Sequence, residues 1–466
     1  MMGTISDKLM RIINTKEDIR QALISKGYDV PTSIPFKEYA KMISDLPCKV
    51  DDFPKLPGDV TRWHFGGLTN EMMAAMDDPR IEDADGKGRF LSFKNFAWKE
   101  GSGISDVYPG ALVFDGVYDC GVCDNFPILT KEKGYTVVVL RQWDQDFLNT
   151  TLTGGLLSTR NYSTGEGVAF EKIESSNKGY WNLGAGGIID FAKSPFTWQT
   201  SKQYNNVGIL KGDKNHGKPL CVGCGLSGGQ QCGRFAIWEL VFLDHDATEE
   251  ELTKIKDYFV KTYPWLFPDQ AWTVVGKTNE DEDRATIANI TGNGNDLALS
   301  NFGFAEGSGY NEEGEYASYL VTDGVDDKII SSIFKMGNDW TVIGDWELIN
   351  TGKNDNAGIV KFDSIVIYNY NYNSMLINIK NGRNILIPDQ NTVNAICSDG
   401  RIYSKDWKES IYNEETESTS KNFLTIGYSG NTYTKIAFKN LAIYPTVLSR
   451  EDCIKAYNYL QTLKAK

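Results

Sequence analysis

The sequence predicts a mainly β protein with two β-sandwich domains in tandem behind a small helical segment. Four sequence blocks recur in the same order at an offset of 201 to 208 residues, which marks two copies of one unit. The β-rich segments are short and lie between clusters of Gly, Asn and Asp. Glycine (45 residues) and aromatic residues (12%) are plentiful, a balance that favours strands and tight turns over helices.

The repeated blocks set the domain boundaries. LSFKNFAWKEGSG and ALVFDGVYD in the first copy match LALSNFGFAEGSG and YLVTDGVDD in the second. Later, LCVGCG and AIWELVFLDHDATEEELTKIKDYF match LTIGYSG and AFKNLAIYPTVLSREDCIKAYNYL. We therefore assign residues 61–268 to the first domain and 269–466 to the second. Residues 51–60 contain two prolines and a glycine and are assigned to a linker.

Within each copy, alternating β-rich segments predict antiparallel strands packed as a sandwich. The clearest helix comes last in each copy, where Thr248 with Glu251, and Ser449 with Asp452, stand at capping-box spacing. The expected strands include 135–140, 235–243, 340–346, 364–373, 377–382 and 423–428.

Residues 1–50 differ from the rest of the chain. They are locally basic, and three short helices are expected there. A segment of this length has too few apolar residues to form a stable core alone. It is either a cap packed on the next domain or a docking device completed by a partner or by oligomerisation.

The repeated motifs carry a resemblance. FDGVYD and TDGVDD, a later Leu-x-Ile/Val-Gly strand, and a last strand followed by a Ser/Thr-capped helix resemble concanavalin A-like (laminin G-like) jelly rolls. The resemblance covers residues 61–466, twice. It implies the fold but not the function, because this fold is found in lectins, adhesion modules, glycosidases and spacers.

The N-terminal segment has a resemblance of its own. Lys8-Leu9, Ile13-Asn14-Thr15-Lys16, Ile19 with Ala22-Leu23, Lys26-Gly27, and Phe36 with Tyr39-Ala40 resemble a leader on structural proteins of tailed bacteriophages, including crAss-like phages of Bacteroides. Leu23 replaces the usual Ile. The resemblance implies a head fibre, tail fibre or capsid decoration protein, assembled in the host cytoplasm and located in the virion.

The same resemblance implies the partners of the segment. Residues 1–50 would anchor the chain to a phage capsid or tail protein, and the expected anchor residues are Leu9, Ile13, Ile19, Phe36 and Tyr39. A homodimer or homotrimer is expected, since fibres are usually oligomeric and the leader alone has a small core.

Composition excludes several classes of protein. The formal net charge of −14 argues against sequence-independent binding of DNA or RNA, which requires clustered Lys and Arg. No window approaches eighteen uninterrupted apolar residues, so no membrane span is expected. The start of the chain lacks an apolar signal-peptide core, so we expect thiols or metal ligands rather than a disulfide framework.

Catalysis is not expected. Glycosidases need two carboxylates at a set separation, and the nearest candidate, Glu280-Asp281-Glu282-Asp283, lies in a polar, loop-like run. The three histidines are not near a Ser or Cys motif that suggests a triad, and no phosphate-binding glycine loop is present. We therefore expect a protein that is not an enzyme and requires no cofactor.

The sequence nevertheless offers two candidate metal sites. Cys120 and Cys123, together with Cys221 and Cys224, form two CxxC pairs that would suit zinc if the fold brings them together. The alternative is buried thiols, and the second copy has Lys328, Ser331, Thr425 and Tyr428 at these positions. Calcium is the second candidate, at Asp323 or the Asp326–Asp327 turn, where aspartates that stabilise the turn are the alternative.

Sugar binding would use exposed aromatic rings beside Asn, Asp and Gly. The candidates lie in KGYWNLG, in a later Trp, and in an alternating Tyr-Asn run whose tyrosines would share one strand face. The alternative is a tyrosine-lined face packed on a neighbour. The candidates are Tyr180, Trp181, Trp198, Tyr368, Tyr370 and Tyr372.

The functional expectation is a non-enzymatic virion protein whose lectin-like domains bind host or gut glycans. The alternative from another class is a bacterial surface protein that binds or degrades glycans. A third interpretation is a spacer or capsid decoration without a ligand.

Overall fold

The structure is a computed structural model. It describes residues 52–127, 134–159, 219–226, 230–332, 334, 337–349, 393–411, 424–429 and 432–465, together with Lys16 and Arg20. Between 160 and 218, and again between 350 and 392, it describes the strands alone. The chain consists of two compact units, Met1–Lys55 and Leu56–Lys466. Apart from Lys16 and Arg20, the expected helices of the N-terminal segment, and all of its expected anchor residues, lie outside the described residues.

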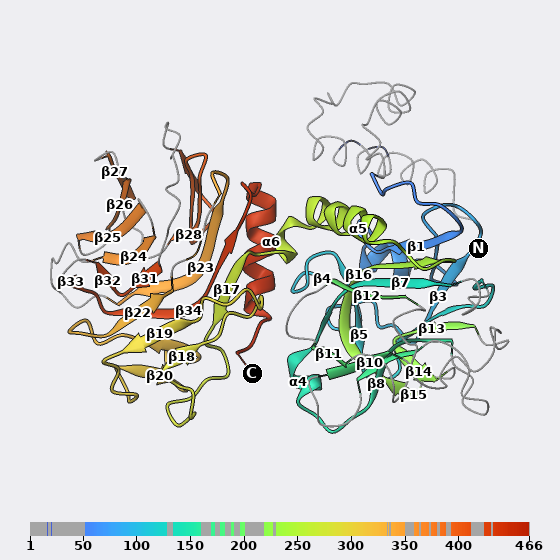
Figure 1. Ribbon diagram of the computed structural model, residues 1–466, viewed down its shortest axis with the longest axis horizontal. Helices are drawn as coiled ribbons and strands as arrows, with labels where there is room; N and C mark the ends of the chain where they lie inside the picture. Colours follow the sequence, from blue (N-terminus) through green and yellow to red (C-terminus); the bar gives the residue numbers. More distant parts are fainter. Residues whose placement is uncertain are drawn as a thin grey trace, which may run out of the picture. The chain divides into compact units, whose positions relative to one another are not determined.

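The first copy forms two sheets in the part of the chain that is described (Figure 1). One has the order β12-β7-β16-β5-β4, with β1 also paired to β16, and the other has the order β11-β10-β9-β8-β13-β6-β3-β2, with β14 and β15 beside β8. The strands are β1 (Val60–His64), β2 (Arg80–Glu82), β3 (Phe90–Lys94), β4 (Gly103–Ser105), β5 (Ala111–Asp115), β6 (Cys120–Cys123), β7 (Thr136–Trp143), β8 (Gly154–Ser158), β9 (Ala169–Lys172), β10 (Lys178–Trp181), β11 (Ile188–Asp190), β12 (Phe196–Thr200), β13 (Leu220–Val222), β14 (Cys224–Leu226), β15 (Gln230–Cys232) and β16 (Arg234–Leu243).

The second copy also forms two large sheets within the described ranges. One has the order β20-β21-β34-β23-β28-β29-β30 with β17 on β34, and the other has the order β18-β19-β22-β31-β24-β25-β26-β27. The strands are β17 (Gln270–Thr273), β18 (Thr286–Ile287), β19 (Leu297–Ser300), β20 (Gly309–Asn311), β21 (Tyr319–Val321), β22 (Lys328–Ser331), β23 (Thr341–Leu348), β24 (Gly358–Phe362), β25 (Ile365–Asn371), β26 (Ser374–Ile379), β27 (Arg383–Ile387), β28 (Val393–Cys397), β29 (Arg401–Ser404), β30 (Glu409–Ile411), β31 (Leu424–Ile426), β32 (Tyr428–Ser429), β33 (Thr432–Tyr433) and β34 (Ile436–Tyr444).

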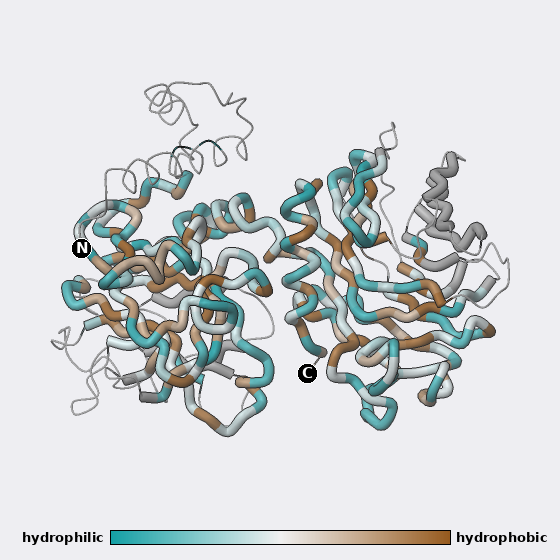
Figure 2. The backbone as a smooth tube through the Cα atoms, turned by 180° about the vertical axis from the view of Figure 1, so that it is seen from behind, coloured by the Kyte–Doolittle hydropathy of each residue, from teal (hydrophilic) through white to brown (hydrophobic). Residues whose placement is uncertain are grey.

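Each pair of sheets encloses one hydrophobic core. In the first copy, Trp63 and Phe114 from one sheet pack in the same cluster as Leu91 and Leu157 from the other. In the second copy, the two sheets likewise share one cluster around Trp272. Figure 2 shows brown, hydrophobic stretches running through the middle of each copy and mostly teal, hydrophilic stretches at its periphery. Each copy is therefore a β-sandwich, and the prediction of a mainly β protein is confirmed.

A helix follows the last strand of each copy. Helix α5 (Glu249–Thr262) begins with a capping box, in which Thr248 accepts from the backbone N–H of Glu251 and Glu251 accepts from that of Thr248. Helix α6 (Arg450–Gln461) begins at Ser449, which accepts from the N–H of Asp452. Two shorter helices, α3 (Asn70–Ala74) and α4 (Gln145–Leu148), are capped by Thr69 and Asp144, and the sequence did not predict them.

The repeat extends to individual hydrogen bonds. The indole N–H of Trp63 donates to the carbonyl of Arg89, and that of Trp272 donates to the carbonyl of Asn295. Asn95 and Asn301 both have φ near +67°. The side chain of Asn95 donates to the carbonyl of Tyr118, and that of Asn301 donates to the carbonyl of Asp326. Two sequences that share so few residues thus form the same local structures. Among the described residues, no helix is long and apolar enough to cross a membrane.

Candidate functional site

The turn after β5 is built by its two aspartates. The carboxylate of Asp115 accepts from the backbone N–H groups of Val117 (2.7 Å), Tyr118 (3.1 Å) and Asp119 (3.3 Å). Asp119 in return accepts from the N–H of Asp115 at 3.0 Å. Gly116 has φ +76°, which a residue with a Cβ adopts only with strain. The D-G-x-x-D sequence therefore specifies a rigid turn.

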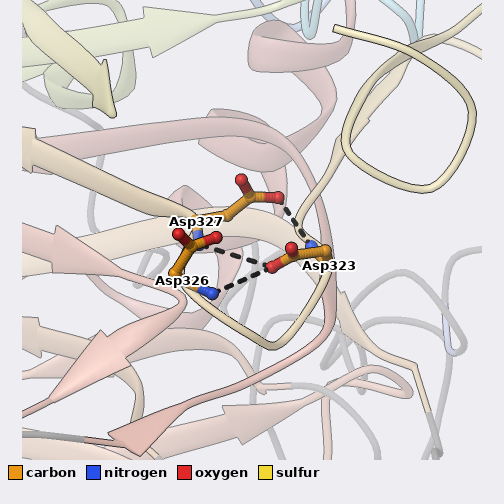
Figure 3. A group of neighbouring side chains, drawn as sticks. All are labelled: Asp323, Asp326 and Asp327. Carbon is orange, nitrogen blue, oxygen red and sulfur yellow. Dashed lines mark hydrogen bonds between the residues drawn. The ribbon is translucent and has the colours of Figure 1, made fainter. Parts of the chain in front are cut away.

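The turn after β21 has the same construction (Figure 3). Asp323 accepts from the N–H groups of Val325 (2.7 Å), Asp326 (3.2 Å) and Asp327 (3.3 Å), and Asp327 accepts from Asp323 at 2.7 Å. Gly324 has φ +75°. The aspartates therefore stabilise this turn through backbone hydrogen bonds.

The tips of the two turns differ in chemistry. The first exposes Val117 (56%) and Tyr118 (62%), whereas the second exposes Val325 (70%) beside the carboxylate of Asp326. Oxygen atoms of Asp323, Asp326 and Asp327 lie within 4.8 Å of one another, as in a set of ligands for a hard cation. Tyr118 occupies the position of Asp326 in the first copy, so the first turn lacks the third carboxylate. Calcium at the second turn stays a prediction.

The inner aspartate of each turn is fully buried, and this changes its protonation. Burial raises the pKa of Asp119 to about 6, despite hydrogen bonds from Ser102 and from the backbone of Asp115. Burial likewise raises the pKa of Asp327 to about 6. Each group is therefore partly protonated in mildly acidic solution, which weakens it as a cation ligand there.

Apart from Tyr372, the aromatic residues expected to bind sugar lie on strands of three different sheets. Tyr180 and Trp181 lie on β10, and Trp198 lies on β12 in the other sheet of the same sandwich. Tyr368 and Tyr370 lie on β25 of the second sandwich, where the register shifts between Asn369 and Asn371. The side chains of these residues, and the whole of Tyr372, lie outside the described part of the structure. Their role in binding stays a prediction.

The structure brings three of the four candidate zinc ligands together. Cys120 and Cys221 have their sulfur atoms 3.5 Å apart, and Cys224 belongs to the same buried cluster. Cys123 instead packs in the hydrophobic core, on the other face of its strand. Its place in the cluster is taken by Cys232, which forms a disulfide with Cys224. The CxxC spacing was misleading because residues i and i+3 of a strand point to opposite faces.

A buried ionic network in the first sandwich was not predicted from the sequence. Arg62 on β1 donates two hydrogen bonds to Glu239 on β16, at 2.6 and 3.1 Å. Glu239 also accepts from the hydroxyls of Tyr258 (3.1 Å) and Tyr263 (2.9 Å), and lies 2.9 Å from the ring nitrogen of His64.

The network fixes the charge of Glu239. Burial opposes ionisation, but the hydrogen bonds and charges of His64 and Arg62 hold the pKa of Glu239 below its ordinary value. The network joins the first strand, the last strand and helix α5. The signal that could have revealed it is Glu239 inside the apolar strand AIWELVFL, because a buried carboxylate needs a partner.

Comparisons with known proteins add little. No family model matches the sequence, and no curated protein matches it. A Trypanosoma rangeli sialidase in complex with sialic acid is 9% identical over 81% of this chain and 67% of that chain, with a TM-score of 0.31. The receptor binding domain of botulinum neurotoxin D is 11% identical over 78% of this chain and 96% of that one, with a TM-score of 0.31.

A further solved structure is covered only in part. The botulinum neurotoxin type G receptor binding domain is 12% identical over 41% of this chain, with a TM-score of 0.26. This chain spans half the length of that one (50%). At these TM-scores the architecture follows from the sheets and cores described above and not from the likenesses.

Proposed function

We propose that this chain is a non-enzymatic virion protein of a tailed phage, whose tandem concanavalin A-like sandwiches bind glycans. The observation that carries the proposal of glycan binding is the pair of turns after β5 and β21. Both keep the D-G-x-x-D framework and its hydrogen bonds, while the residues at the tips differ. A constant framework that holds a variable exposed surface is the arrangement expected of a binding module.

The first tip offers the clearest contact for a sugar. Tyr118 is 62% exposed, and the backbone that carries it is fixed by the carboxylate of Asp115. An exposed aromatic ring on a fixed backbone can stack on the apolar face of a pyranose without the cost of ordering the loop. The acidic tip of the second sandwich would select different ligands, so the two domains need not bind the same glycan.

The virion location rests on the resemblance of residues 1–50 to phage leaders. The chain would be anchored by that segment and would display the sandwiches outward. Immunogold electron microscopy of purified virions, with antibody against residues 61–466, tests this part. Label on intact particles supports it, and label confined to lysate debris contradicts it.

Glycan binding is tested on intact candidate host cells. The full chain is labelled and applied before and after periodate oxidation of the surface sugars. Binding that periodate abolishes supports the proposal. Unchanged binding after periodate points to a protein receptor, and no binding by protein that is folded by circular dichroism favours a spacer or decoration role.

A further inference from the structure

A buried cluster of four cysteines occupies one sheet of the first sandwich. It consists of Cys120 on β6, Cys221 on β13, Cys224 on β14 and Cys232 on β15, each at most 6% exposed. The segments that carry them are up to 112 residues apart in sequence, so the fold itself gathers the sulfur atoms. We call this group the four-sulfur cluster.

Strand register explains how the cluster forms. Cys221 lies opposite Val122 in the β6–β13 pair, so Cys120, two residues earlier on β6, is its diagonal neighbour on the same face. Cys224 lies directly opposite Cys232 in the β14–β15 pair. Two cross-strand pairs of cysteines therefore meet at one face of the sheet.

One sulfur–sulfur distance in the four-sulfur cluster already suits a tetrahedral metal site. Zinc–thiolate bonds of about 2.3 Å place the sulfur atoms of a tetrahedral site about 3.8 Å apart. The sulfur atoms of Cys120 and Cys221 are 3.5 Å apart, close to one edge of such a tetrahedron. Reduction of the Cys224–Cys232 disulfide gives two more thiols in the same buried cluster.

The fold does not require these cysteines. At the matching positions the second sandwich has Lys328, Thr425 and Tyr428, and it forms the corresponding strands β22, β31 and β32. Four buried sulfur atoms are thus an addition to a framework that is complete without them. If the chain is made in a reducing compartment, as the proposed function implies, clustered cysteines indicate a metal or catalytic site rather than a disulfide framework.

We propose that the reduced protein binds one zinc ion through Cys120, Cys221, Cys224 and Cys232. The disulfide is then the oxidised, metal-free form of this site. A thiol reductant such as glutathione transfers two electrons to the Cys224–Cys232 bond and is itself oxidised to its disulfide. Zinc binding then displaces the protons of the cysteine thiols, and the resulting thiolates are the ligands.

Cobalt is the direct probe of the site. The full chain is reduced with a phosphine under anaerobic conditions, freed of reductant and titrated with Co²⁺. The expected result is a sulfur-to-cobalt charge-transfer band with the visible bands of tetrahedral cobalt, saturating at one ion per chain. Zinc should displace the cobalt, and elemental analysis should then find one zinc per chain. Reduced, folded protein that gives no such bands contradicts the proposal.

Variants identify the ligands. Cys120→Ser, Cys224→Ser and Cys232→Ser should each lose most of the bound zinc. The matched control is Cys123→Ser, which changes the other half of the same CxxC motif but faces the hydrophobic core. It should keep one zinc per chain in its folded fraction. Loss of zinc in Cys123→Ser with retention in Cys232→Ser would overturn the assignment of ligands. If the variants fold poorly, the cobalt titration of the wild type decides whether the site binds metal.

Discussion

The two sandwiches share a framework and differ in what is added to it. Both have a buried tryptophan on the first strand, a D-G-x-x-D turn and a capped helix after the last strand. The first sandwich has in addition the four-sulfur cluster and the ionic network around Glu239. At the position that matches Glu239, the second sandwich has the neutral residue Asn440. The comparison teaches that turn chemistry and core shape specify this fold, while buried charges and thiols are local additions.

Changes to the shared framework should give the largest losses in free energy of unfolding, and these losses should be equal in the two copies. Trp63→Ala and Trp272→Ala each remove a fully buried indole and its hydrogen bond. Each should lower the free energy of unfolding by about 3 to 5 kcal/mol. Urea unfolding followed by circular dichroism measures both, and a cost below about 1 kcal/mol for either variant would show that the copies are not equivalent.

The buried network should make one effect specific to the first copy. Arg62→Ala leaves the carboxylate of Glu239 buried with fewer compensating donors, at a cost of about 3 to 5 kcal/mol. Adding Glu239→Gln to this variant should restore part of the loss, because the buried charge is then removed. The matched change in the second copy, Asn440→Ala, removes one neutral hydrogen bond to Leu460 and should cost about 1 kcal/mol. Equal costs for Arg62→Ala and Asn440→Ala would contradict this account of the network.

The turns should give smaller effects of the same size in both copies. Asp115→Ala and Asp323→Ala each remove the acceptor of three backbone N–H groups. By analogy with the loss of a helix cap, each should cost about 1 to 2 kcal/mol. Thermal unfolding of the two variants and the wild type measures this. A loss in Asp323→Ala that appears only when calcium is present would instead assign the second turn to metal binding.

A further effect depends on pH. The pKa of Asp327 is raised to about 6 in the folded chain, above its value in the unfolded chain. Its contribution to stability is therefore fully present below about pH 4 and is lost as the pH rises through about 6. The difference in free energy of unfolding between Asp327→Asn and wild type should accordingly favour the variant more at pH 7.5 than at pH 4.5. Both measurements are made in buffer with a chelator. Urea unfolding at the two pH values tests this, and no change between them would contradict the raised pKa.

The sequence predicted the framework well because periodicity and turn residues are local signals. The strand expected at 235–243 is β16 (Arg234–Leu243), and the capping residues Thr248 and Ser449 lie at the starts of α5 and α6. The site was harder to predict because it depends on strand register. Cys232 stands outside the CxxC motifs, so only the pairing of β14 with β15 places it beside Cys224. Glu239 was missed for the same reason, since its partners lie up to 177 residues away.

The central claim, that a common framework presents glycan-binding tips, is tested most directly on a glycan array with the full chain. The expected result is saturable binding to a defined set of glycans. Tyr118→Ser should reduce the affinity about tenfold or more, which corresponds to about 1.4 kcal/mol of binding free energy. The matched control Leu152→Ser changes another exposed apolar side chain (57%), in the loop before β8, and should bind like wild type. Absence of binding by folded protein, or equal losses in the two variants, would contradict the claim.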